Sequence, residues 1–91
     1  MTDIRRILVE LDEVDVKILE LVKEKSGQVN LKMIADQLKI DKATCSRHIK
    51  KLEQLGLIRC QELGPCKVPM LTALGFQVLE VFRRLSPSSS S

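Results

Sequence analysis

Apolar residues recur along the first quarter of the chain at the spacing of an α-helix. The positions that fit, at alternating intervals of three and four residues, are Ile4, Ile7, Leu11, Val14, Ile18 and Leu21. This spacing places them on one stripe of a helix. Asp12 can cap a helix through its carboxylate, so residues 3–24 form either one long helix or, as we expect, two that meet near Asp12. Gly27 can adopt the left-handed conformation that closes helices, so the helical region ends at residues 26–27.

Two short helices are predicted next, over residues 31–39 and 42–55. Asn30 and Asp41 can cap them, and Gly56 supplies the stop after the second helix. The inward-facing positions at helical spacing are Leu31, Ile34, Ala35 and Leu38 in the first helix and Cys45, Ile49 and Leu52 in the second. Two short helices joined by about three residues form a helix-turn-helix.

A small β-hairpin follows, with strands over residues 57–62 and 66–71 and a turn between them. Pro69 cannot donate a ladder hydrogen bond, so its strand lies at an edge or is bulged at that point. Thr72 can cap a final helix that runs to about Leu85. The predicted fold is therefore mainly α with a small β-hairpin, in one domain over residues 1–85. The serine-rich residues 86–91 are expected to be disordered because they cannot bury surface.

Length, composition and charge narrow the classes of function. The chain has 91 residues, enough for one domain, and its two Phe without Trp or Tyr disfavour stacking on single-stranded nucleic acid. The net charge of +3 is unevenly distributed, since residues 1–25 hold five basic and seven acidic residues and residues 26–56 hold six and three. Residues 42–51 contain four Lys or Arg and no acid. Positive charge is thus concentrated on the second helix of the helix-turn-helix.

This second helix has the properties of a helix that reads DNA. If Cys45, Ile49 and Leu52 face the core, a turn of about 100° per residue points the cationic side outward. Small and polar residues near its start let the backbone approach base edges in the major groove, and Arg47 can fork onto O6 and N7 of a guanine. The predicted DNA contacts of this helix are Lys42, Ala43, Thr44, Ser46, Arg47, Lys50 and Lys51. The alternative interpretation is an ordinary solvated helix face.

Residues 34–58 resemble the helix-turn-helix of prokaryotic winged-helix transcription regulators of the MarR, ArsR and Lrp/AsnC types, with the sequence IADQLKIDKATCSRHIKKLEQLGLI. The elements that carry the resemblance are Ala35, Thr44-x-Ser46-Arg47 and Leu52-x-x-x-Gly56-Leu57-Ile58. Residues 11–19 are similar to the first helix of the Lrp/AsnC type, and residues 71–75 to the segment after the wing in the MarR type. The resemblance implies a recognition helix over residues 42–55 in the major groove. It also implies a hairpin wing over residues 57–71 on the flanking backbone, with Arg59 and Lys67 as its cationic contacts.

The sequence therefore predicts a sequence-specific transcriptional regulator that binds double-stranded DNA as a homodimer in a prokaryotic cytoplasm. No apolar run reaches the length of a membrane span, and the first residues do not form a signal peptide. Because a chain this small has a marginal core, its apolar first and last helices are expected to form the dimer. The predicted dimer contacts are Ile4, Ile7, Leu8, Leu11, Leu74, Val78, Val81 and Leu85. Two alternatives stay open, namely a winged-helix module that binds protein without specific DNA binding, and a metal- or redox-sensing variant of the regulator.

The cysteines and the single histidine support no catalytic site. Cys60 and Cys66 flank the predicted turn, so a disulfide between them is conceivable if the strands pair about Leu63, but we favour free thiols. The spacing Cys45-x-x-His48 is weak evidence for a metal, since Cys45 is expected in the core. The sequence has no Gly-rich phosphate loop and no convergent pair of carboxylates. We therefore predict no enzyme activity, no metal and no cofactor.

Overall fold

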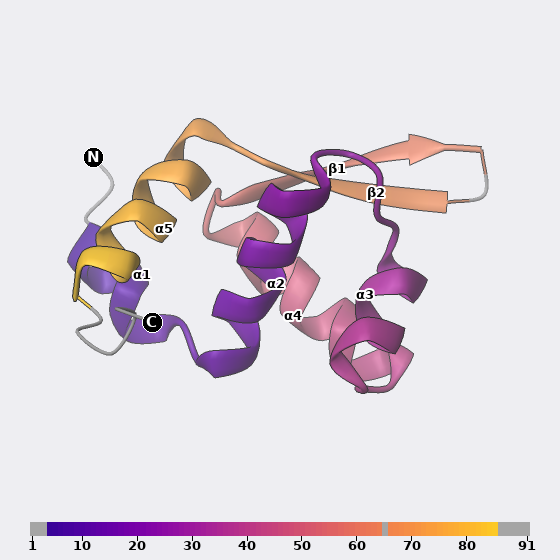
Figure 1. The fold of residues 1–91 in the computed structure, drawn as a ribbon, viewed down its shortest axis with the longest axis horizontal. Coiled ribbons are helices and arrows are strands. Elements are labelled where there is room, and N and C mark those ends of the chain that lie inside the picture. Colours follow the sequence, from indigo (N-terminus) through magenta and orange to yellow (C-terminus); the bar gives the residue numbers. More distant parts are fainter. Residues whose placement is uncertain (1–3, 65, 86–91) are drawn as a thin grey trace.

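A run of helices, a hairpin and a last helix follow one another along the chain in the order expected. The structure is a computed structural model, and it describes residues 4–64 and 66–85. Its elements are α1 (Ile4–Glu10), α2 (Glu13–Lys25), α3 (Leu31–Leu38), α4 (Lys42–Gln54), β1 (Ile58–Leu63), β2 (Cys66–Leu71) and α5 (Ala73–Leu85). Figure 1 shows α1 and α5 side by side at one end, and the hairpin extending from the helices toward the other end. The mainly α fold with a small hairpin is confirmed.

The first helical region is broken at Asp12, as the capping argument predicts. Asp12 has extended backbone angles, and its side chain accepts a hydrogen bond from the Asp15 N–H at 2.9 Å. The Asp15 side chain in turn accepts from the Asp12 N–H at 3.0 Å. This reciprocal arrangement is a capping box, which satisfies two N–H groups that the start of a helix leaves unpaired. It fixes where α1 ends and α2 begins.

The helix-turn-helix forms from the predicted caps. The Asn30 side chain accepts from the Met33 N–H at 2.9 Å, and the Asp41 side chain accepts from the Thr44 N–H at 2.8 Å. Between the helices, Lys39 adopts a left-handed conformation with φ of 59°, which ends α3. The predicted spans of 31–39 and 42–55 each include one residue more than α3 and α4, because Lys39 and Leu55 are the C-caps.

The two strands pair antiparallel, with β1 ending at Leu63 and β2 beginning at Cys66. Leu63 lies opposite Cys66, and Cys60 lies opposite Pro69. The first strand thus begins at Ile58 rather than at residue 57. The conceivable disulfide between Cys60 and Cys66 is wrong, because this register offsets the two residues by three positions and Cys60 is a free thiol.

The core lies between α2, α3, α4, α5 and the inner side of the hairpin. Its fully buried side chains include Ile18, Leu19, Ile34, Ile49, Leu52, Leu57, Val78 and Leu79. On α4, the buried residues are Cys45, Ile49 and Leu52, as its helical periodicity predicts. The start of α5 is tied to the end of α4, because the Thr72 hydroxyl donates to the Gly56 carbonyl at 2.6 Å and accepts from the Gly75 N–H at 3.0 Å.

Two of the predicted dimer contacts belong to this core instead. Ile7 is 5% exposed and Val78 is fully buried within the single chain, so neither is available to a partner. Val78 packs inward because α5 covers α2, and Ile7 because α1 lies along α5. The serine-rich residues 86–91 fall outside the described residues. Within the described residues, no helix is long and apolar enough to cross a membrane.

Candidate nucleic-acid interface

The outer side of α4 carries most of the predicted DNA contacts. Lys42, Ala43, Arg47 and Lys50 are exposed, whereas Thr44 and Ser46 are half-buried on the flanks. Because Cys45, Ile49 and Leu52 anchor the opposite side, these residues form one continuous polar surface. The structure thus brings together the small residues near the start of α4 and the long cations one turn later.

The charge of this surface is not neutralised by neighbouring acids. In residues 4–64 and 66–85, no carboxylate forms an ion pair with Arg47 or Lys50. The acids that flank these two residues along the chain are Asp41, whose side chain caps α4, and Glu53, three residues after Lys50. Hydrogen bonds from Thr44 hold the pKa of Asp41 below its usual value, and the charge of Arg47 contributes to the same shift. Arg47 and Lys50 are therefore available to an external anion.

The two predicted wing cations lie on opposite faces of the hairpin. Arg59 pairs with Met70 and Glu62 pairs with Lys67, three positions further along the ladder. Side chains alternate between faces along a strand, so Arg59 and Lys67 point to different sides. Lys67 also faces the acidic Glu62 directly across the ladder, where opposite charges attract. Lys67 therefore has an acid directly opposite it in the ladder, whereas Arg59 has Met70.

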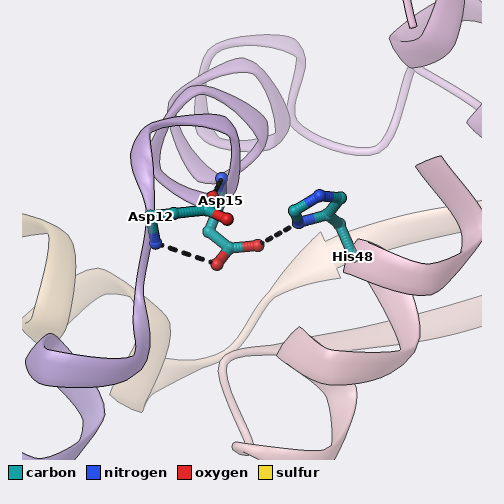
Figure 2. Close-up of side chains that lie close together, drawn as sticks. All are labelled: Asp12, Asp15 and His48. Atoms are coloured by element: carbon teal, nitrogen blue, oxygen red, sulfur yellow. Dashed lines mark hydrogen bonds and ion pairs between the residues drawn. The ribbon is translucent and has the colours of Figure 1, made fainter. Parts of the chain in front are cut away.

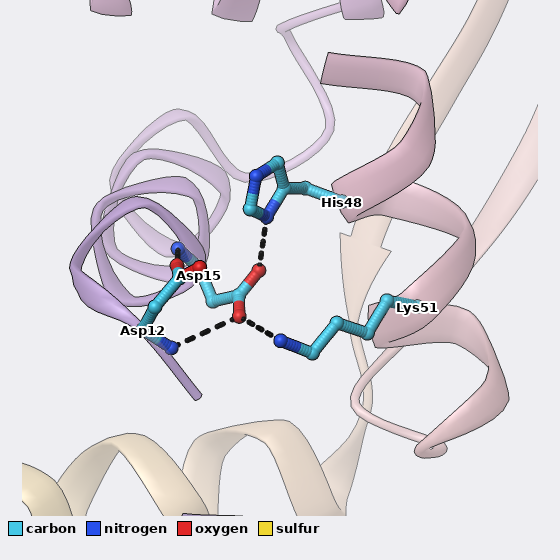
Figure 3. A network of polar contacts seen from close by, with 4 residues as sticks. All are labelled: Asp12, Asp15, His48 and Lys51. Carbon is cyan, nitrogen blue, oxygen red and sulfur yellow. Dashed lines mark hydrogen bonds and ion pairs between the residues drawn. The ribbon is translucent and has the colours of Figure 1, made fainter. Parts of the chain in front are cut away.

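Lys51 departs from the prediction that it contacts phosphate. Its Nζ lies 2.7 Å from Oδ2 of Asp15, a carboxylate on α2 that is fully buried. His48 reaches the same side chain, with Nδ1 at 2.6 Å from Oδ1 of Asp15. Figure 3 shows the two side chains of α4 converging on the Asp15 carboxylate, which also accepts a hydrogen bond from the Asp12 N–H. Lys51 lies on the side of α4 that faces α2. Its ammonium group therefore pairs with a buried carboxylate rather than facing solvent with Arg47 and Lys50.

Asp15 is held in its ionised form by this network. Burial alone would raise the pKa of Asp15, but hydrogen bonds from Lys51, the Asp12 N–H and His48, together with the charge of Lys51, lower it below 3.8. The hydrogen bond to Asp15 correspondingly raises the pKa of Lys51. A carboxylate can only accept hydrogen bonds, so Nδ1 of His48 carries the proton. Removing a partner would leave a buried charge without compensation, which is costly.

Asp15 and His48 are the site residues that sequence reasoning missed. A signal for Asp15 is present, because it lies on an apolar stripe with Leu11, Ile18 and Val22 at intervals of four, three and four residues. A charged residue on a buried stripe requires a partner. The sequence does not reveal which of the many cations that partner is.

The surroundings of Cys45 and Cys60 do not favour the alternative sensor sites. Cys45 is fully buried and its thiol donates to the Leu31 carbonyl at 3.6 Å, so it cannot share a metal with His48. Burial raises the pKa of the Cys45 thiol. Burial also raises the pKa of Cys60, to about 11, with a contribution from the adjacent Glu53 carboxylate. Both thiols stay protonated near neutral pH, which disfavours redox chemistry.

A second group of metal-ligating side chains is already occupied. Ligand atoms of Asp12, Asp15 and His48 lie within 4.8 Å of one another (Figure 2). The Asp15 carboxylate accepts from His48, Lys51 and the Asp12 N–H, and the Asp12 carboxylate accepts from the Asp15 N–H. A cation would have to displace the Lys51 ammonium, so these residues fit an ion pair better than a metal.

A helix-turn-helix followed by a two-stranded hairpin and a further packed helix defines the class of winged helix-turn-helix domains. The chain belongs to the winged helix-turn-helix DNA-binding family, whose family model matches residues 11–59. The family resemblance predicted from residues 34–58 is therefore confirmed. Among curated protein sequences, none matches the chain.

Solved structures of transcriptional regulators have the same fold. A MepR mutant from S. aureus, bound to an oligodeoxyribonucleotide, is 20% identical with a TM-score of 0.79, over 86% of this chain and 59% of its own. A MarR protein from Peptoclostridium difficile is 24% identical with a TM-score of 0.79, over 96% and 58% respectively. The transcriptional regulator BldR from Sulfolobus solfataricus is 26% identical with a TM-score of 0.74, over 86% and 60%. The chain spans about three fifths of the length of these regulators.

Proposed function

We propose that this protein is a sequence-specific regulator of transcription that binds double-stranded DNA as a homodimer and acts by binding alone, without catalysis. In this proposal α4 enters the major groove, and the wing of β1 and β2 lies along the flanking backbone. Arg47 reads a base, while Lys42, Lys50 and Arg59 contact phosphates. Lys51 is assigned a minor role because it forms an ion pair with Asp15, and Lys67 because Glu62 lies opposite it in the ladder.

The outward surface of α4 is the observation that carries this proposal. It combines small residues at its start with exposed, unpaired cations one turn later, on a helix whose other side is anchored in the core. A helix that reads the major groove needs close backbone approach and at least one side chain that can fork onto a base edge. A protein-binding surface would more often expose apolar or acidic residues at these positions. DNA-bound MepR, which has the same fold, supports the choice of partner.

The proposed dimer uses the end where α1 and α5 lie together. Leu85 is 67% exposed at the end of α5, and Leu74 and Val81 are partly buried on the same side of that helix. Ile4, Leu8 and Leu11 are likewise only partly buried on α1. Two copies joined here would set their recognition helices about 34 Å apart, one turn of DNA, over a near-palindromic site.

DNA recognition is tested by comparing Arg47→Ala with Lys50→Ala. Duplexes selected by the wild-type protein from a randomised library, and scrambled versions of them, are titrated in a mobility-shift assay at two salt concentrations. Arg47→Ala should weaken the selected duplex by about 1 to 3 kcal/mol with little effect on the scrambled one. Lys50→Ala should weaken both alike, since a phosphate carries no sequence information. No shift by the wild-type protein at low salt would refute the proposal.

Dimerisation is tested on α5 with a matched pair of variants. Leu85→Glu places a charge on the proposed interface, whereas Phe76→Glu places one on the opposite side of the same helix, where Phe76 is 49% exposed. Sedimentation equilibrium should give a monomer for Leu85→Glu and a dimer for Phe76→Glu and the wild type. A monomeric wild type at concentrations where it binds DNA would contradict the proposed assembly.

A further inference from the structure

The recognition helix is fastened to α2 by a charged contact that the DNA-binding proposal does not use. We propose that Asp15 is a positioning residue for DNA recognition, which sets the orientation of α4 and withdraws Lys51 from the DNA surface. This inference rests on the proposed function. Asp15 itself is fully buried, so it cannot touch DNA and must act through the residues it holds.

The geometry of the contact constrains α4 in more than one direction. His48 and Lys51 are three residues apart, so they project from neighbouring turns on one side of the helix. Each bonds a different oxygen of one carboxylate, at 2.6 Å and 2.7 Å. The carboxylate is fixed in turn by the Asp12 N–H at 3.0 Å, inside the capping box that starts α2 (Figures 2 and 3). Two directional bonds to a fixed group therefore resist both rotation and sliding of α4.

The apolar side of α4 does not impose the same constraint. This side is buried through Cys45, Ile49 and Leu52. Hydrophobic burial is not directional, so it would tolerate small rotations of the helix. Arg47 lies next to the two residues that bind Asp15. One open hollow is lined by Thr44, Arg47, His48 and Lys51. A small rotation of α4 would move the end of the long Arg47 side chain most. Fixing α4 therefore fixes the base-reading side chain.

The second consequence concerns charge. A lysine that contacts phosphate strengthens binding to every sequence alike, and so adds affinity without specificity. By pairing with Lys51, Asp15 removes one such contact from each subunit. Asp15 should thus raise the ratio of specific to non-specific affinity in two ways, by orienting Arg47 and by neutralising Lys51.

The test compares Asp15→Asn with Glu13→Gln in the full chain. Both variants remove one carboxylate from the first turn of α2, so they change the net charge equally, but the Glu13 side chain is 83% exposed and pairs only with Lys17 at the surface. Dissociation constants are measured by fluorescence anisotropy on a library-selected duplex and on its scrambled version, over a series of salt concentrations. Circular dichroism confirms that each variant is folded at the assay temperature.

Asp15→Asn should lower the ratio of selected to scrambled affinity by about tenfold, the size of one lost base contact. It should also steepen the slope of log K against log salt by about 0.9 per subunit as Lys51 is released, and Asp15→Asn/Lys51→Gln should return the slope to that of the wild type. Glu13→Gln should change neither ratio nor slope. A folded Asp15→Asn with the ratio and slope of Glu13→Gln would overturn the inference while leaving the proposed function intact.

A second variant tests the positioning role of Asp15 if Asp15→Asn does not fold. His48→Leu keeps the ion pair between Asp15 and Lys51 and, because leucine has no donor, removes one of the two bonds that orient α4. It should lower the affinity ratio without changing the salt slope. An unchanged ratio in folded His48→Leu would overturn the positioning role. Absence of DNA binding by the wild type would instead remove the proposed function, and the inference with it.

Discussion

Replacing Lys51 by Met should destabilise the protein far more than replacing its neighbour Lys50. Lys51→Met keeps a long side chain but leaves Asp15 fully buried with only His48 and the Asp12 N–H as partners. Breaking a buried ion pair costs about 3 to 5 kcal/mol. The lower end applies because the Lys51 side chain is 34% exposed and two donors to Asp15 remain. With a urea m-value of about 1.5 kcal/mol/M, a loss of about 3 kcal/mol lowers the midpoint by about 2 M.

The control and the double variant make this prediction specific to the buried charge. Lys50→Met removes an exposed cation and should change the free energy of unfolding by less than about 0.5 kcal/mol. Asp15→Asn/Lys51→Met removes both charges and should be more stable than Lys51→Met alone, since no uncompensated ion stays buried. Urea unfolding followed by circular dichroism measures all four proteins. Equal midpoints for Lys50→Met and Lys51→Met would refute the reasoning.

Three further predictions concern packing, pH and thiol reactivity. Gly75→Ala should destabilise by about 2 to 3 kcal/mol in urea unfolding, because a Cβ there would lie 2.2 Å from the Leu57 carbonyl oxygen, which the Thr72 N–H holds in place. A cost below that of the exposed Gln77→Ala would contradict the clash. The stability that Asp15 contributes should be complete above about pH 4 and lost as pH falls through its lowered pKa. Urea midpoints of Asp15→Asn should therefore vary less with acid pH than those of the wild type, and parallel curves would argue against it. Cys60, with a pKa of about 11 against an ordinary 9.0, should react with iodoacetamide at pH 8 about a hundredfold more slowly in the folded than in the urea-unfolded protein. Peptide mapping measures this rate, and equal rates in both states would show that its thiol is not shielded.

The elements of this fold were predictable because their signals are local. Caps at Asp12, Asn30 and Asp41 act within three residues, and the buried stripe of α4 follows from helical period alone. The features that the sequence did not predict depend on how helices and strands pack against one another. The partner of Asp15 lies on another helix, 33 to 36 residues away. The register of the hairpin also depends on how two segments meet, because a shift of one residue in a strand changes every cross-strand pair.

The same limit applies to the dimer surface. Ile7 and Val78 fit the apolar stripes of the terminal helices as well as Leu85 does. Which of them stays exposed depends on how α1, α2 and α5 pack within one chain, and only Leu85 remains largely exposed. An apolar stripe identifies a buried side of a helix without saying whether the chain itself or a partner covers it.

The last prediction concerns the salt dependence of DNA binding, which depends on how many Lys and Arg side chains are free to contact phosphate. The sequence alone offers five candidate phosphate contacts per subunit, namely Lys42, Lys50, Lys51, Arg59 and Lys67. Each contact contributes about −0.9 to the slope of log K against log salt, so a dimer using all of them would have a slope of about −9. The structure pairs Lys51 with Asp15 and sets Lys67 opposite Glu62, which leaves three per subunit and a slope of about −5.

Glu62→Gln tests whether Glu62 keeps Lys67 from contacting phosphate, at an exposed position of the wing where no buried group is disturbed. Freed from the acid opposite, Lys67 should become able to contact phosphate, and the slope should steepen by at most about 1.8 per dimer. Glu80→Gln is the matched control, because it removes an exposed carboxylate from α5, where the carboxylate pairs with Arg84. Fluorescence anisotropy across a salt series measures both variants. A wild-type slope near −9 would mean that paired lysines still displace counterions, and equal slopes for the two variants would mean that Glu62 does not control Lys67.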